Sequence, residues 1–481
     1  MTASAAPPVV DVVPLIERQR PGRFWITLFA VSWVVTFLDG FDFQILSFAG
    51  TSIKNAFGLT DTQLGTLGTV GLSGTLVGGL CLGYLGDRIG RRPSIIVATA
   101  GFGIFMILFV FARDYSHLVI LRFVSGLFLG GVLPLAWALN TEFAPARLRS
   151  TSVAIIMIGY SLGSAAGGPV SIALIPSYGW QSVFLVGGIC SLLAVIPVAL
   201  ALPESVKFLA QKDMAHDRIA MIMRRVAPGR EFPSDTRFVV GSGEVHKGRF
   251  TPAQLFRGVL ANLTVLLWIA YICSSAIVFY LAFWGPILNE RLGFSATAAA
   301  LIGAAASVAG ALGQLAIVRF IDNRGAGTIA LMPLLGVPCL LAIGFAPLSP
   351  AAYIVILMAT NVFIIGGHGG MHSISGIFYQ PAIRANGAAW ATSIAKFGAM
   401  LGPWLAGVLL DGGFEAKETF YVFALFPLAM SLLLFALGRA QRRLPADAEG
   451  SLPAGRGLAV RPAAGDDAAR TFIPSEAKER T

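Results

Sequence analysis

Runs of about twenty apolar residues recur along the whole chain, and they constrain the fold more than any other feature. A stretch of that length crosses the hydrocarbon core of a bilayer as one α-helix. Only 12% of the 481 residues are charged, whereas soluble domains carry about 25% charged residues. The sequence therefore predicts an all-α membrane protein with about twelve transmembrane helices. The predicted spans cover residues 24–48, 62–84, 94–112, 116–139, 150–174, 180–202, 259–285, 297–319, 327–346, 351–378, 385–410 and 418–438.

Arginine is concentrated in every second loop between these spans. One set of loops and termini holds most of the arginines, whereas the other set holds only Lys54, Arg113, Arg291 and Lys417. Because basic loops stay on the cytoplasmic side, both termini are expected there. The net charge of +10 follows this loop pattern, so we expect no nucleic-acid partner.

The chain divides into two similar halves around a polar linker. Residues 57–60 recur in similar form at 292–295, and residues 87–90 recur at 322–325, both at an offset of about 235 residues. Two parallel six-helix repeats place a substrate site near the midplane, between the halves. We predict a cytoplasmic N-terminal segment, an N-terminal six-helix bundle, a cytoplasmic linker with a short surface helix near 206–226, a C-terminal six-helix bundle and a disordered cytoplasmic tail, at residues 1–23, 24–202, 203–258, 259–438 and 439–481.

Two carboxylates lie near the end of the first span. Asp39 and Asp42 are three residues apart and so share one face of a helix. Each costs about 2.5–3.5 kcal/mol at a helix centre in a bilayer, so this face should point to a water-filled cavity or a buried cation. Because two nearby negative charges raise the pKa of one carboxyl group, one of the two can gain and lose a proton. The alternative is that both carboxylates lie hydrated at the outer interface. Phe43 and Gln44 in the same stretch are candidate substrate contacts.

Two further charged residues flank the fourth span. Arg122 lies about two turns inside it and needs a carboxylate partner, for which we propose Asp39 or Asp42. The alternative is that Arg122 extends to the outer headgroups. Glu142 is a candidate for proton coupling, although its spacing from Arg147 and Arg149 favours a local salt-bridged turn.

Lys396 is the strongest candidate for a substrate contact, because it lies in the middle of a span and has no acidic residue near it in sequence. An incoming carboxylate would be its natural partner, and the alternative is an ion pair with an aspartate of another span. Trp390, about two turns earlier, is expected to stack on an aromatic substrate. Tyr271 and Phe279 of the seventh span are further aromatic candidates.

His368 and His372 lie four residues apart on the tenth span, within a glycine-rich stretch. They are candidates to hydrogen-bond a phenol or carboxylate, or to relay protons, and the alternative is a packing role. We expect no metal site, because further ligands are missing nearby.

The loop between the second and third spans, residues 83–92, reads GYLGDRIGRR. This loop resembles the loop motif of the major facilitator superfamily. The resemblance of the chain to that superfamily covers about residues 24–438. The aspartate of the loop can accept bonds from helix N-termini and arginines, and so latch one conformation. The candidate gating residues are Gly83, Asp87, Arg88, Gly90 and Arg91, together with Asp322 in the repeat.

Within that superfamily, the Asp-Gly-x-Asp of the first span resembles the bacterial aromatic acid:proton symporters. Arg122 and Glu142 bracket span four as in that family, and Arg384 and Lys396 match paired basic positions of span eleven. The family usually has arginine where this chain has Lys396, and lysine is a compact point charge rather than a bidentate donor.

The resemblance implies proton-driven uptake of a small aromatic carboxylate of the 4-hydroxybenzoate or lignin-derived type. It also implies a monomer in the bacterial inner membrane that uses the proton gradient and no cofactor. The alternatives are symport of another organic anion, export of an amphipathic compound in exchange for protons, or a non-transporting sensor. We do not expect an enzyme; an energy-coupling enzyme in particular is not expected, since the sequence has no phosphate-binding loop and ATP drive would need a partner.

Overall fold

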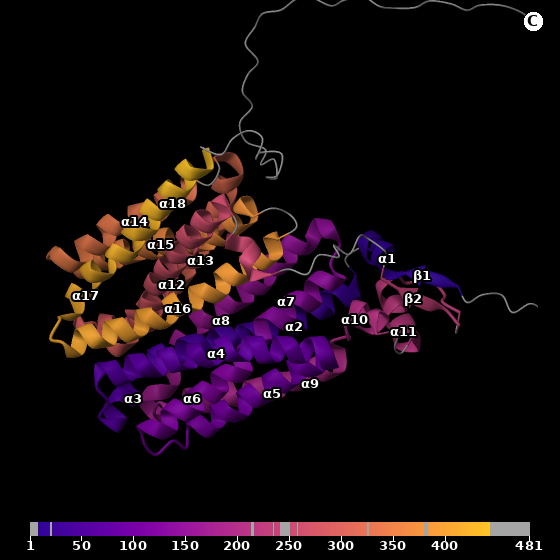
Figure 1. Cartoon of the computed structure of the whole chain (residues 1–481). Helices are drawn as coiled ribbons and strands as arrows, with labels where there is room; N and C mark the ends of the chain where they lie inside the picture. The colour runs from indigo at the N-terminus through magenta and orange to yellow at the C-terminus, as the bar shows by residue number, and fades with distance from the viewer. Residues whose placement is uncertain are drawn as a thin grey trace, which may run out of the picture.

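Helices long enough to cross a membrane dominate the molecule (Figure 1). The computed structural model describes residues 8–19, 22–212, 216–233, 235–240, 251–256, 258–324, 327–379 and 383–442. Within these ranges, 11 helices have the length and hydropathy of membrane spans, and a shorter apolar helix covers Ile329–Phe345. The predicted class, an all-α membrane protein with about twelve spans, is confirmed.

The spans fall into two groups of six. The N-terminal half contains α2 (Arg23–Phe48), α4 (Asp61–Ile89), α5 (Arg91–Phe109), α6 and α7 (Tyr115–Leu129 and Val132–Phe143, one broken span), α8 (Arg149–Tyr178) and α9 (Gln181–Ala201). The C-terminal half contains α12 (Val259–Arg291), α13 (Ala296–Arg324), α14 (Gly327–Phe345), α15 (Pro350–Phe378), α16 (Arg384–Asp411), and α17 and α18 (Ala416–Phe423 and Leu425–Arg442, the last span). A short helix, α3 (Gly50–Phe57), links the first two spans.

Both halves use the same order of packing. In the N-terminal half α2 packs on α8, α4 on α6 and α5 on α9; in the C-terminal half α12 packs on α16, α13 on α15 and α14 on α18. In each half the first span therefore contacts the fifth, the second the fourth and the third the sixth. This correspondence confirms the two six-helix pseudo-repeats predicted from the sequence offset.

The two halves contact each other mainly through α4 with α16 and α8 with α13. They lie closest at the end that carries α3 and α17, and their axes diverge toward the other end (Figure 1). We call the end that carries α3 and α17 the opposite end, because it lies opposite the basic end defined next. The other, which carries the loops around residues 90 and 146 and the N-terminal segment, we call the basic end.

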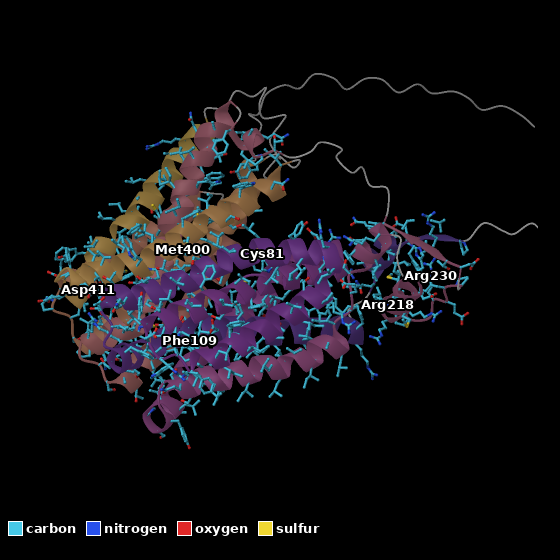
Figure 2. The ribbon with its side chains drawn as sticks, turned by 60° about the horizontal axis from the view of Figure 1, so that its bottom comes forward. Cys81, Phe109, Arg218, Arg230, Met400 and Asp411 are labelled. Carbon is cyan, nitrogen blue, oxygen red and sulfur yellow. The ribbon has the colours of Figure 1, made fainter. Side chains whose placement is uncertain are left out.

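A small folded unit, the basal cap, covers the basic end of the N-terminal half (Figures 1 and 2). It consists of β1 (Val9–Asp11), α1 (Val12–Arg18), α10 (Val206–Gln211), α11 (His216–Val226) and β2 (Arg237–Val239). The two strands pair in parallel, and Val12, Ile219, Met223 and Phe238 are buried in one apolar cluster.

The linker is thus more structured than expected. We predicted one short surface helix near 206–226, and the structure has two helices there with a strand that pairs to the N-terminal segment. Three-residue strands carry too little alternation to be read from sequence. The predicted disordered tail from 439 lies almost entirely outside the described residues.

Glycines set the close approach of α2 to α8. A Cβ added at Gly40 would lie 1.9 Å from the carbonyl oxygen of Tyr160, and one at Gly163 would lie 1.9 Å from that of Phe37. A backbone oxygen cannot rotate away as a side chain can. The spacing of the two helices therefore requires glycine on each of them.

We expect Gly40→Ala to lower the free energy of unfolding by about 3 kcal/mol, at the upper end of overpacking costs, because the helices must separate. Thermal unfolding of the purified protein in detergent measures the effect. The matched control is Gly285→Ala in α12, where an added Cβ meets nothing within 4 Å. Equal unfolding temperatures for the two variants would contradict the close contact.

Candidate functional site

Asp39 and Asp42 lie well inside α2 and are both buried, with 6% and 1% of their surfaces exposed. This burial excludes the alternative of a hydrated pair at the outer interface. Two buried carboxylates require compensating positive charge nearby. Cationic side chains reach the pair from both halves of the molecule.

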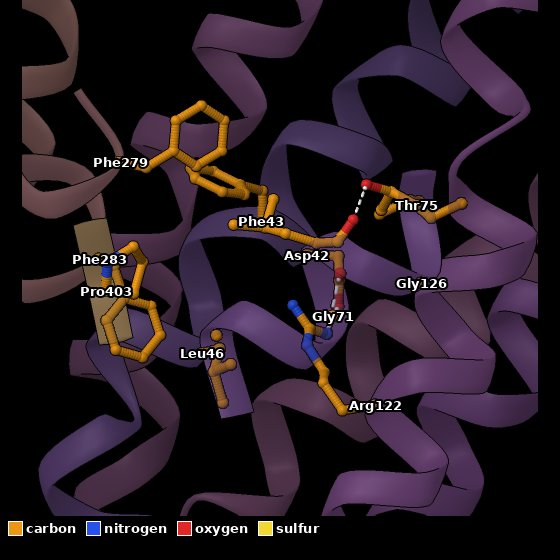
Figure 3. Close-up of a pocket in the computed structure, with 13 residues that line it drawn as sticks. Asp42, Phe43, Leu46, Gly71, Thr75, Arg122, Gly126, Phe279, Phe283 and Pro403 are labelled. Carbon is orange, nitrogen blue, oxygen red and sulfur yellow. Dashed lines mark hydrogen bonds and ion pairs between the residues drawn. The ribbon is translucent and has the colours of Figure 1, made fainter. Parts of the chain in front are cut away.

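Arg122 of α6 compensates the negative charge of Asp42. Its Nη1 donates to Asp42 Oδ1 at 2.9 Å and to Oδ2 at 3.0 Å, and Figure 3 shows the two side chains facing each other. The side chain of Arg122 is only 10% exposed, so it does not extend to the headgroups. Of the two partners proposed from the sequence, the structure selects Asp42.

The packing around this ion pair leaves it little freedom. An added Cβ at Gly71 would lie 2.9 Å from Arg122 Nε, so glycine gives the guanidinium its space. The buried Nε itself has no hydrogen-bond partner among the described residues. The Asp42 carboxylate is therefore the hydrogen-bond partner that the structure gives the Arg122 guanidinium.

Lys396 of α16 reaches the same region from the C-terminal half. Its Nζ donates to the Thr75 hydroxyl of α4 at 3.2 Å, and its charge interacts with that of Asp39. The sequence left a substrate carboxylate and an intramembrane aspartate as alternative partners. The structure puts Asp39 within electrostatic range of Lys396, at a longer range than the Asp42–Arg122 contact.

A narrow pocket with about 30 Å³ of space accessible to water lies beside the Asp42–Arg122 pair, between the halves (Figure 3). Phe43, Phe279 and Phe283 line it together with Thr75 and Pro403, among others. The rings of Phe43 and Phe279 meet edge to face with centroids 5.2 Å apart. The pocket therefore combines a fixed charge pair with aromatic walls, as an amphipathic ring compound requires. Since the space is narrow, admitting a ring needs movement of the lining side chains.

Tyr160 of α8 is a candidate that the sequence analysis missed. Its hydroxyl is close enough to interact electrostatically with both Asp39 and Asp42, and its ring lies 6.2 Å from that of Phe43. The available signal was a tyrosine inside an apolar span, which is weak by itself because such residues more often pack in the core.

Other candidates from the sequence lie away from this pocket. Gln44 bridges the halves, since its Nε2 donates to the carbonyl oxygen of Ala282 at 2.8 Å. Tyr271 is fully buried and donates to the carbonyl oxygen of Met371 at 2.7 Å, which ties α12 to α15. Neither side chain lines the described pocket.

Trp390 does not line the described pocket, so its expected contact with a substrate stays a prediction. Trp390 is 39% exposed and stacks on Trp268, with ring centroids 6.1 Å apart. Six residues separate it from Lys396, and at about 100° per residue the two side chains point about 120° apart around the helix. They do not share one side of the helix.

His368 lies on α15 beside α12, where its Nδ1 is 2.8 Å from the Ser274 hydroxyl oxygen. Among the described residues no group of three or more metal-ligating side chains occurs. The side chains of His372, Arg384 and Asp322 lie outside the described part of the chain, so their roles stay predictions.

The loop motif sits at the basic end, far along α4 from the charged pocket. Asp87 is 73% exposed and pairs with Arg91 at 3.0 Å, while Arg88 lies over the Tyr84 ring at 4.8 Å. Gly90 has a φ of 108°, and a Cβ there would lie 2.2 Å from a carboxylate oxygen of Glu204. Gly83 has open space around it, so the structure gives it no steric role.

Glu204, which the sequence analysis did not single out, holds this loop. Its carboxylate accepts hydrogen bonds from the backbone N–H groups of Arg91 and Ser205, each at 2.8 Å. Arg91 begins α5, and a carboxylate at a helix N-terminus is favoured by the exposed N–H groups there. The motif is thus tied to the start of the linker.

Glu142 belongs to this cluster and not to the buried charge pair. It accepts a hydrogen bond from the Ser205 hydroxyl and lies 3.6 Å from Arg91 Nε. The predicted local turn with Arg147 and Arg149 is wrong, because Arg149 pairs with Glu17 of α1 at 2.6 Å. The short 3-10 helix Ala146–Leu148 separates Glu142 from Arg149, which lies beside the N-terminal segment instead.

Charged groups close the opposite end between the halves. The carboxylate of Asp411, at the end of α16, accepts the N–H groups of Asp61 and Thr62 at 2.9 and 2.8 Å. Asp61 in turn pairs with Lys54 and with Arg291 of α12. Deeper in the bundle, Ser47 Oγ donates to the carbonyl oxygen of Phe283 at 2.5 Å. These contacts join both halves at this end.

We expect Asp411→Asn to shift the molecule toward a state open at the opposite end, because one charged acceptor for two N–H groups becomes neutral. A loss of about 2 kcal/mol would change the ratio of the two states about 30-fold. With the four native cysteines replaced, alkylation of a cysteine introduced at Thr69, whose hydroxyl bonds the carbonyl oxygen of Met400 in the other half, measures the change. Glu415→Gln, beyond the end of the same helix, is the control. Equal alkylation rates in both variants would contradict the closing role of Asp411.

The fold and the site define a class of protein. Two six-helix halves with a charged, aromatic-lined pocket between them, closed at one end, have the architecture of a secondary transporter. The family comparison agrees, because residues 32–380 match the Major Facilitator Superfamily. The chain belongs to the major facilitator superfamily, and it is a transport protein rather than an enzyme.

Curated relatives are similar over most of the chain. The 4-hydroxybenzoate transporter PcaK of Acinetobacter baylyi is 31% identical, and the match covers 84% of this chain and 89% of the relative. A gallate transporter of Pseudomonas putida is 30% identical over 91% of this chain and 98% of its own length. A 3-(3-hydroxy-phenyl)propionate transporter of Escherichia coli is 31% identical over 81% of this chain and 88% of its own length. The resemblance to aromatic acid transporters read from the motifs is therefore confirmed.

Solved structures support the fold. The xylose transporter XylE from E. coli in an inward open conformation has a TM-score of 0.69 at 16% identity, covering 86% of this chain and 96% of that one. A bacterial homolog of the human lysosomal transporter Spinster, in an inward-facing and unoccupied conformation, has a TM-score of 0.65 at 17% identity, covering 87% and 98%.

Proposed function

We propose that this protein imports a small aromatic carboxylate together with protons, by alternating access between its two halves. The substrate would be a hydroxylated benzoate or a related lignin-derived acid, as for the transporters of 4-hydroxybenzoate, gallate and 3-(3-hydroxy-phenyl)propionate to which the chain is similar. The observation that carries the proposal is Lys396, which lies within electrostatic range of the buried Asp39 and donates to Thr75 in the wall of the aromatic-lined pocket.

The charges suggest how binding and protonation are coupled. With Asp39 ionised, Lys396 already has a negative charge within range. A proton on Asp39 removes that charge, and the ammonium group is then left for the carboxylate of the substrate. Proton and anion therefore enter the site together, and neither alone leaves the buried charges balanced.

The Asp42–Arg122 pair provides a second element of the coupling. Protonation of Asp42 would weaken its contacts with Arg122 and let α2 and α6 move relative to each other. The halves would then rock around the pocket. The proton gradient supplies the energy, without a cofactor.

The proposed orientation follows from the arginine-rich loops, which put the basic end and both termini in the cytoplasm of a bacterial inner membrane. The conformation described above, closed at the opposite end, then corresponds to an inward-facing state. The protein is proposed to act as a monomer, since each chain contains both halves of the site.

Exchange of labelled 4-hydroxybenzoate into proteoliposomes loaded with the unlabelled acid tests the substrate class. Benzoate and gallate should compete with the label, whereas methyl 4-hydroxybenzoate, which keeps the ring and lacks the charge, should not. Succinate serves as an aliphatic anion control. Equal competition by the ester and the acid would contradict a fixed cation as the recognition element, and competition by succinate alone would point to an aliphatic anion as substrate.

A further inference from the structure

A second hollow lies at the basic end, on the outside of the N-terminal half. It has about 430 Å³ of space accessible to water, is open to solvent, and is lined by Arg23, Phe24, Thr27, Leu200, Ala201 and Arg225. We call it the interfacial groove. It shares no lining residue with the charged pocket between the halves.

The position of the groove coincides with the ends of two membrane spans. Arg23 is the first residue of the span Arg23–Phe48, and Ala201 is the last of the span Gln181–Ala201. The third wall comes from α11 of the basal cap, through Arg225. A groove between two span ends and a surface helix lies at the depth of lipid headgroups.

The charge of the groove is entirely positive. Its lining contains two arginines and no carboxylate. Over the described part of the chain, neither guanidinium makes a hydrogen bond or an ion pair; the Thr27 hydroxyl bonds the backbone oxygen of Arg23 instead. Both arginines are exposed. Two guanidiniums that line one hollow provide donors for a phosphate oxyanion.

The wall next to these arginines is apolar. Leu200 is 79% exposed, and Ile26, one turn into α2, is 60% exposed. Both belong to helices with the length and hydropathy of membrane spans, so these exposed side chains suit contact with lipid. The groove therefore offers a cationic part at the span ends and an apolar part along the spans. A phospholipid has this division of charge, whereas a soluble anion or a nucleic acid has no chain to place against Leu200.

We propose that the interfacial groove binds the phosphate headgroup of an anionic phospholipid, with the acyl chains along α2 and α9. Arg23 comes from the bundle and Arg225 from the basal cap, so one bound headgroup bridges the two units. The lipid would join the linker helix α11 to the first and sixth spans. This binding does not depend on the transported substrate.

Binding to the purified protein in uncharged detergent tests the proposal, with dioctanoyl phosphatidylglycerol as the probe and native mass spectrometry as the readout. Dioctanoyl phosphatidylcholine controls for headgroup charge, and glycerol phosphate controls for a site that needs no acyl chains. We expect binding of phosphatidylglycerol to exceed that of both controls. Equal binding of phosphatidylcholine, or equally tight binding of glycerol phosphate, would overturn the proposal without the use of any variant.

The paired variant Arg23→Gln/Arg225→Gln identifies the site. We expect phosphatidylglycerol to bind about 20- to 30-fold more weakly, since each arginine near an anionic headgroup contributes about fivefold. The matched control, Arg18→Gln/Arg218→Gln, removes the same charge from exposed positions on α1 and α11 outside the groove; Arg218 is labelled in Figure 2. If both double variants weakened phosphatidylglycerol binding equally, the loss would be explained by the lower net charge alone. That result would contradict a specific site at the groove.

Discussion

Replacing Lys396 by methionine is expected to reduce uptake of an aromatic carboxylate about 100-fold. Methionine preserves the length and apolar character of the side chain but removes the positive charge. The loss corresponds to about 3 kcal/mol, at the upper end for a hydrogen bond to a charged group. Initial rates of labelled 4-hydroxybenzoate uptake into proteoliposomes, compared at equal protein content, measure the effect.

The control for this variant is Lys396→Arg. Arginine keeps the positive charge and the ability to bind a carboxylate, so we expect at least a tenth of the original rate. Lys396→Met protein that transports like the unaltered protein would contradict the assignment. Equal losses in both variants would indicate that the site needs the shape of lysine and not its charge.

The second large effect is expected at the buried pair of Asp42 and Arg122. Arg122→Gln leaves the carboxylate of Asp42 buried without its cation, which should cost about 3–5 kcal/mol of unfolding free energy. The double variant Asp42→Asn/Arg122→Gln removes both charges, so most of this stability should return. Thermal unfolding in detergent measures this part of the prediction.

In the same two variants, we expect transport activity and stability to change independently. The double variant is expected to fold but to lose accumulation driven by a proton gradient, because no ion pair remains for a proton to break. A double variant that is as unstable as Arg122→Gln would contradict the compensation between the two charges. Full proton-driven accumulation by the double variant would show that the pair is structural.

Much of the fold could be predicted from the sequence, because a bilayer restricts the length and composition of the helices that cross it. Apolar length alone located the spans, and the repeated segments near residues 58 and 293 indicated two equivalent halves. Local chemistry also follows from sequence neighbours: Thr60 precedes the second span and forms a capping box with Gln63. These features depend on neighbours in sequence or on one periodicity.

The charged pocket was predictable for the same reason. Asp42 and Arg122 are costly inside a membrane, so each one implied a partner before any geometry was known. The choice between Asp39 and Asp42 as that partner could not be read, because both lie on one face of α2. It depends on how α6 is rotated and on the space that Gly71 leaves for the guanidinium.

Contacts between distant segments could not be predicted. The ties of Glu204 to Arg91, and of Asp411 to Asp61, join residues that no local pattern connects. The position of Trp390 against Trp268 likewise depends on the rotation of α16. Side chains with such long-range partners need the packed structure, because many alternative pairings satisfy the same composition.

The central claim, proton-coupled import of an aromatic acid, is tested most directly with the unaltered protein in proteoliposomes. Labelled 4-hydroxybenzoate is supplied outside at low pH with an alkaline interior, and its internal concentration is followed with and without a protonophore. The account predicts accumulation above the external concentration that collapses when the protonophore is added. Uptake that only equilibrates, whether or not the gradient is present, would contradict the coupling, and expulsion of the acid under an inward proton gradient would reverse the direction of transport.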